Sequence, residues 1–256
     1  MLKLTIVNNE YKTTVKGARK MPKGLQPKGV ARRNKMLLAA VQLFLENGYE
    51  KTTTAAIARA AGMAPSSFFA AFENKEALLL TLVQQMFNRQ FENAEQLLGE
   101  QKDPLMLYGI ETALQMYITE LSEPLRELYV MAYSLPTTCE YIYNNTAERL
   151  SVIFADYLPE AEKKDFYEMD IASGGITRGF MAKHCHLYFK IEDKIRRHLQ
   201  CCFTLYQVPK EKQDAVIDAV LEVDLQSIAQ KLIEDTIVQA HRGFEAVMTT
   251  KEGKKA

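Results

Sequence analysis

Three short stretches with helical hydrophobic periodicity, separated by two glycines, constrain the fold of this chain more than any other feature. Apolar side chains recur on one helical face over residues 36–45, and Gly48 follows at the position where a left-handed residue ends a helix. Thr53 can cap a second helix, Gly62 can end it, and Pro65 suits the first turn of a third. The pattern therefore predicts a small head made of three short helices.

Longer helices are predicted after this head. Asn74 can cap a long amphipathic helix that reaches about Glu100, and Asp103-Pro104 begins the next. The one indication of a strand is a weak alternation of apolar and polar residues over 2–6. The further helices are expected at residues 105–121, 124–134, 138–157, 162–190, 192–206 and 211–247. The fold class is all-α, with a basic arm (1–30), a head (31–78) and a larger helical body (79–256).

Charge is distributed unevenly, although the formal net charge is zero. Residues 1–35 carry ten basic side chains against one acidic residue, Glu10, and residues 36–75 are neutral, so the remainder is acidic. A basic end on an acidic body favours nucleic acid as a partner, because it orients the molecule in a phosphate field. The arm itself can be read either as a segment that grips DNA or as a leader, with Met21 or Met36 as an alternative start.

Other classes of protein are disfavoured by composition. No apolar run is long enough to span a bilayer and no secretion signal is evident, so a cytoplasmic location without membrane contact is expected. The four cysteines form no C-x-x-C pair and are interpreted as reduced core residues. None of the common catalytic or nucleotide-binding motifs is present, so we expect neither an enzyme nor a cofactor.

The segment 53–72 has the elements of a helix-turn-helix motif. Ala58 and Ala61 allow two helices to cross closely, Gly62 provides the turn, and the residues that begin at Ala64 form a projecting end. The whole stretch from R-R-N-K-M-L-L to F-E-N-K-E-A-L-L resembles the N-terminal domain of TetR-type regulators. The resemblance is strong because L-F..-G-Y..-T-T...-I-A..-A-G and F-F..-F.-N-K-E-A-L-L occur together.

This resemblance implies which residues approach DNA. The start of the second helix would approach the backbone or the base edges, and Lys75 would contact a phosphate. The residues placed in these DNA-facing positions are Thr53, Thr54, Ala55, Ala64, Pro65, Ser66, Ser67, Phe69 and Ala71. The basic side chains around them add phosphate contacts, for which we single out Arg32, Arg33, Lys51 and Lys75.

The recognition segment, which begins at Ala64 and includes Phe69 and Ala71, departs from the family pattern. Phe69 stands where a tyrosine hydroxyl usually binds phosphate, and Ala71 stands where histidine or tyrosine is common. The segment has no Arg, Lys, Asn or Gln, the side chains that contact guanine or adenine in a bidentate manner. The groups left for base contacts are the hydroxyls of Ser66 and Ser67 and apolar residues such as Ala64 and Pro65, which can lie beside thymine methyl groups. Affinity is therefore expected to depend strongly on the basic residues around the head.

In the body, the resemblance implies a ligand pocket and a dimer interface. The pocket residues that we single out are Tyr117, Met131, Tyr133, Tyr143, Phe180 and His184, with plain core packing as the alternative for each. His184 and His186 do not suggest a metal site, because side chains two apart on a helix point about 200° apart. Three glycines at 174, 175 and 179 lie within a predicted helix, where glycine is less favourable than alanine. A close helix crossing, a kink or a dimer contact would offset this cost.

The function predicted from these features is that of a homodimeric repressor. It would bind a palindromic double-stranded DNA operator and be released by a small-molecule effector, whose identity the sequence does not give. The alternative is a helical adaptor of the same fold that has lost specific DNA binding and acts through protein partners. The dimer contacts are expected from the helix near 162–190 and from the last long helix.

Overall fold

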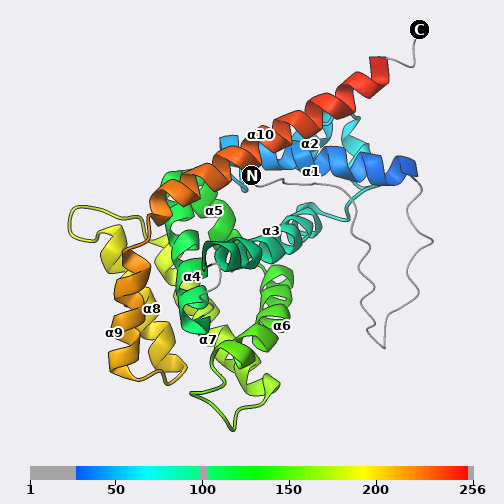
Figure 1. The fold of residues 1–256 in the computed structure, drawn as a ribbon. Helices are drawn as coiled ribbons and strands as arrows, with labels where there is room; N and C mark the ends of the chain where they lie inside the picture. The colour runs from blue at the N-terminus through cyan, green and yellow to red at the C-terminus, as the bar shows by residue number, and fades with distance from the viewer. Residues whose placement is uncertain (1–26, 99–102, 253–256) are drawn as a thin grey trace.

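The computed structural model describes residues 27–98 and 103–252, and every regular element within them is a helix (Figure 1). An isolated bridge between His186 and Phe189 is the one strand-like pairing in these ranges. The predicted all-α architecture is confirmed. The possible strand at residues 2–6 and most of the basic arm lie outside the described residues.

The head contains two α-helices and one 3₁₀ turn. Helix α1 spans Pro27–Asn47, α2 spans Thr54–Ala60, and the turn η1 spans Pro65–Ser67. Helix α1 begins four residues before the predicted start at Ala31. The predicted third helix begins at Pro65 as expected but forms one 3₁₀ turn, and Ala64 provides no side-chain cap for it.

Eight helices follow the head. Helix α4 is central, because it packs against α3, α5, α8, α9 and α10. It begins at the predicted Asp103-Pro104 site, where the Asp103 carboxylate accepts bonds from the amides of Leu105 and Met106. The bounds are α3 Lys75–Leu98, α4 Pro104–Leu121, α5 Glu123–Ala132, α6 Pro136–Ile153, α7 Lys163–Ala182, α8 Ile191–Leu205, α9 Lys210–Leu221 and α10 Leu225–Glu252.

Two predicted helices differ from the observed ones. The helix expected over 162–190 ends at Ala182, and a loop with the bridged residues 186 and 189 follows. His184 and His186 therefore lie on this loop, so the helical geometry used to reject a shared metal ion does not apply to them. The segment expected over 211–247 is divided after Leu221, and Asp224 caps α10 through the amide of Ser227.

Two hydrophobic clusters organise these helices. The head cluster joins α1, α2, the two phenylalanines after η1 (Phe68 and Phe72) and the first turns of α3 with Leu128 of α5 and Ile142 of α6. The body cluster lies around α4 and includes the start of α10. Helix α10 then lies alongside α1 (Figure 1), so the last helix is packed against α4 and α1 of its own chain.

Candidate nucleic-acid interface and internal cavity

The turn between α2 and η1 has the geometry expected for a helix-turn-helix motif. Thr53 caps α2, because its hydroxyl accepts a 3.1 Å bond from the amide of Ala56. Gly62 has a φ of +71°, which L-residues rarely adopt, and its amide donates to the carbonyl of Arg59. The buried Ile57 and Ala58 anchor α2 in the head cluster. Thr54 and Ala55, the other predicted residues of this helix start, are half-buried.

The recognition segment divides its side chains between core and solvent. Phe68 and Phe72 are buried and hold the segment to the head cluster. The exposed side includes Phe69, which is 63% exposed. Ser67 and Ala71 are half-buried between the two sides, and the remaining exposed residues before Phe69 are Ala64, Pro65 and Ser66.

Lys75 is directed into the head. Its ammonium donates to the carbonyls of Tyr49 at 2.7 Å, Thr52 at 3.0 Å and Glu50 at 3.4 Å. It also lies 4.1 Å from the centroid of the Tyr49 ring. Burial lowers the pKa of Lys75, and the charges of Glu127 and Glu50 oppose that shift. All three donors have partners inside the head, so the phosphate contact at Lys75 stays a prediction.

Arg33 has a similar internal role. Its guanidinium donates to Thr81 Oγ1 at 2.8 Å and to the carbonyl of Ala71 at 3.4 Å, and it stacks 4.4 Å from the centroid of Phe72. The side chain thereby fastens α1 to the recognition segment and to α3. Arg32 is half-buried, whereas Lys51 is exposed at the α1–α2 turn. Of the four predicted phosphate ligands, Lys51 is thus the most accessible.

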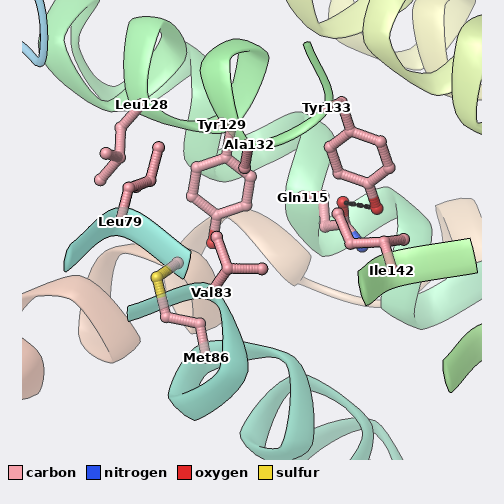
Figure 2. A pocket seen from close by; sticks show the side chains of 9 residues that line it. All are labelled: Leu79, Val83, Met86, Gln115, Leu128, Tyr129, Ala132, Tyr133 and Ile142. Atoms are coloured by element: carbon pink, nitrogen blue, oxygen red, sulfur yellow. Dashed lines mark hydrogen bonds between the residues drawn. The ribbon is translucent and has the colours of Figure 1, made fainter. Parts of the chain in front are cut away.

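A cavity lies between α3, α4, α5 and α6 (Figure 2). Its volume is about 30 Å³, which is space for about one water molecule, so a larger guest requires side chains to move. Most of its wall is apolar, and the polar groups are two tyrosines and one glutamine. The lining residues are Leu79, Val83, Met86, Gln115, Leu128, Tyr129, Ala132, Tyr133 and Ile142.

A chain of hydrogen bonds runs from this cavity into the body. The Tyr133 hydroxyl donates to Gln115 Oε1 at 3.2 Å, as Figure 2 shows, and Gln115 Nε2 donates to the Glu111 carboxylate at 2.5 Å. Burial raises the pKa of Glu111 to about 7, although the Gln115 bond and the charge of Arg149 oppose this. Glu111, which is hydrogen-bonded to the cavity-lining Gln115, therefore changes its charge near neutral pH.

Comparison with known proteins agrees with the helix-turn-helix geometry. The sequence model of the family described as bacterial regulatory proteins, tetR family, matches residues 36–82. An HTH-type transcriptional regulator of Bacillus subtilis strain 168, YvkB, is 26% identical over 162 residues, which cover 62% of this chain and 78% of the relative. The head of this chain is therefore similar to that of TetR-family transcriptional regulators, and the likeness to YvkB extends beyond the head.

One solved structure has a related fold, and a second has a weaker likeness. The crystal structure of RolR with its ligand resorcinol has a TM-score of 0.58 at 13% identity, and the match covers 77% of this chain and 96% of RolR. SmeT, the repressor of the Stenotrophomonas maltophilia multidrug efflux pump SmeDEF, has a TM-score of 0.48 at 18% identity, covering 67% of this chain and 88% of SmeT.

Of the predicted ligand residues, Tyr133 is the one that lines the cavity. Tyr143 packs against Tyr167 with ring centroids 6.2 Å apart, and Phe180 contacts the ring of His198. His184 is exposed and its Nδ1 lies 2.8 Å from Glu120. Tyr117 is partly buried against the body cluster and Met131 against the head cluster.

The sequence carried a signal for the cavity residues that were missed. Leu79, Val83 and Met86 recur at helical spacing on α3, but such a stripe also describes ordinary core packing. The part of the chain with described side chains has no cluster of three or more His, Cys, Asp or Glu that could hold a metal ion. Its helices are also too short or too polar to cross a membrane.

One helix contacts both the cavity and the DNA-binding head. Helix α5 lines the cavity with Leu128, Tyr129 and Ala132. The preceding residue, Glu127, accepts a 2.6 Å bond from the amide of Glu50 in the α1–α2 turn. The fit is tight at Gly48, whose φ is +83°, because a Cβ there would lie 2.2 Å from Glu127 Oε2. A displacement of α5 would therefore reach the turn that precedes α2.

Proposed function

We propose that this protein is a cytoplasmic homodimeric repressor of the TetR family that binds a palindromic operator and releases it when a small molecule enters the cavity. The observation that carries this proposal is the double contact of α5. The helix lines the cavity with three side chains and holds the α1–α2 turn through Glu127. A ligand that prefers a displaced α5 would misplace the heads, and by linkage the operator would weaken binding of that ligand.

The cavity lining favours an uncharged and mainly apolar effector. None of its nine lining residues is charged, so an ionised ligand would lose its hydration without a counter-charge at the wall. Gln115 and Tyr133 can orient one hydroxyl or carbonyl group of such a ligand. The small cavity volume implies that Met86 and other flexible side chains rearrange as the ligand enters.

We place the dimer contact on the exposed side of α7. Gly175 and Gly179 face open space within the chain, and Ile171 on the same helix is 48% exposed. Two glycines without an internal packing role allow the α7 helix of a second copy to approach closely. Two heads held in this way would match two half-sites about one helical turn of DNA apart.

The first test selects duplexes from a random-sequence pool with the purified full-length chain at low salt. We expect the retained sequences to share a palindrome and the affinity to fall steeply as salt increases. A folded dimer that retains no duplex even at low salt would contradict the proposal and favour the adaptor function.

The second test fills the cavity without a ligand. Ala132→Leu adds volume on the α5 wall, and we expect it to weaken binding to the selected duplex by about fivefold or more. Ala215→Leu is the matched control, because Ala215 is exposed on α9 and away from the cavity lining. Equal affinities of the two variants would separate the cavity from DNA binding and would contradict ligand-controlled release.

A further inference from the structure

The exposed side of the recognition segment is apolar. Ala64, Pro65, Phe69 and Ala70 are exposed, and Ser66 is the single exposed residue between 64 and 71 with a polar side chain. Phe69 stands out because a large aromatic ring with 63% of its surface in solvent is not held there by the head cluster. A surface of this kind is complementary to a partner with apolar groups.

The position of the Phe69 ring is fixed by its neighbour. Its centroid lies 5.5 Å from that of the buried Phe68, with the rings edge to face at 77°. The backbone is fixed as well, because the amides of Ala71 and Phe72 both donate to the carbonyl of Phe68 at 2.9 Å. The ring is therefore presented outward by an ordered turn.

The chemistry of base edges selects one partner for this surface. In the major groove, guanine, adenine and cytosine present hydrogen-bonding groups, whereas thymine adds an apolar C5-methyl group. The exposed residues 64–71 include no side chain that can make a bidentate contact to guanine or adenine. Because the recognition segment that follows the turn is the part of a helix-turn-helix that enters the major groove, thymine methyl groups are the apolar partner it meets there.

We propose that this head reads its operator mainly through thymine C5-methyl groups packed against Phe69 and Pro65. The proposal rests on the proposed operator binding and specifies its chemistry: thymines at fixed positions of each half-site give specificity, and the surrounding phosphate contacts give affinity. Removing a contacted methyl group should weaken binding while the base pairing and the minor groove remain unchanged.

The test uses the duplex selected by the purified protein, resynthesised with deoxyuridine in place of each thymidine in turn. Deoxyuridine lacks only the C5-methyl group. We expect substitution at one or more positions in each half-site to lower the affinity about fourfold, because the burial of one methyl-sized group is lost. Equal affinity for the thymidine and the fully substituted deoxyuridine duplexes would overturn the inference and leave operator binding intact.

A variant then assigns the effect to Phe69. Phe69→Ala should weaken binding to the thymidine duplex by about tenfold and should abolish the difference between thymidine and deoxyuridine at the contacted positions. Val152→Ala, which trims another exposed apolar residue on α6, should retain the full difference. Full discrimination by Phe69→Ala would overturn the role of this ring. Failure to select any duplex would overturn operator binding and this inference together.

Discussion

The head and the body differ in what they bury. The described head buries apolar side chains with one polar exception, Thr52, whose hydroxyl donates to backbone carbonyls of Leu43 and Gly48. The body buries ionisable groups as well. These groups are Glu111, Asp170, Lys194 and His198. The head thus has an ordinary apolar core, whereas the body also buries ionisable groups.

The buried polar groups of the body are incompletely satisfied. Asp170 accepts a bond from Ser173 at 2.7 Å, but its second oxygen has no hydrogen-bond partner among the described residues, and the same holds for Nδ1 of His198. Burial raises the pKa of Asp170 to about 6 and lowers that of His198 to about 4. Buried polar groups that lack a hydrogen-bond partner lower the stability of the folded state that contains them. The comparison shows unsatisfied polar groups buried in the body and none in the described part of the head.

The largest expected effect tests whether the head depends on its apolar core. Phe44 is completely buried and its ring lies 5.3 Å from that of Tyr49. Phe44→Ala should lower the free energy of unfolding by about 3–5 kcal/mol, because it removes transfer energy and leaves a cavity. Urea unfolding followed by circular dichroism measures this, with Val152→Ala as an exposed control. A loss below about 1 kcal/mol would contradict a head stabilised mainly by a closely packed apolar core.

The next effect tests the buried charge of the body. The pKa of Glu111 lies at about 7 in the fold, against an ordinary value of 4.5, so folding favours its protonated form. Its destabilising effect is absent below about pH 4.5, grows as pH rises to about 7, and is constant above that. Glu111→Gln should therefore raise the free energy of unfolding at pH 8 by on the order of 2 kcal/mol.

The pH dependence provides the control for this substitution. The advantage of Glu111→Gln over the wild type should disappear near pH 4.5, whereas Glu222→Gln, at an exposed position, should leave the stability curve unchanged. A difference that stays constant from pH 4.5 to pH 8 would mean that Glu111 keeps its ordinary pKa in the folded chain.

A smaller effect concerns the contact that joins the two regions. Glu127→Ala removes a bond to the amide of Glu50, and Gly48→Ala forces a Cβ toward the same carboxylate at a positive φ. Each should cost about 1 kcal/mol. The double variant should lose less than the sum, because the shorter side chain makes room for the new Cβ. Strictly additive losses in a double-mutant cycle would show that Gly48 and Glu127 do not act on each other.

Sequence signals correctly predicted those features of the head that depend on the residues of a single turn. Gly48 and Gly62 both have positive φ, and Thr53 and Asn74 both cap helices, as their positions predicted. Lys75 could not be placed in this way, since its partners are carbonyls of a turn more than twenty residues earlier. The cavity depends on four helices, so most of its lining was missed for the same reason.

The smallest effect distinguishes two neighbouring glycines of α7, Gly174 and Gly175. A Cβ on Gly174 would lie 2.9 Å from a ring carbon of Tyr143, whereas one on Gly175 would meet nothing within 4 Å. In the isolated chain, Gly175→Ala should therefore stabilise the helix by about 0.5–1 kcal/mol, while Gly174→Ala should not. Sedimentation then tests the proposed interface, because the added methyl group should weaken a dimer that packs against this face. An unchanged dissociation constant for Gly175→Ala would move the dimer contact away from this side of α7.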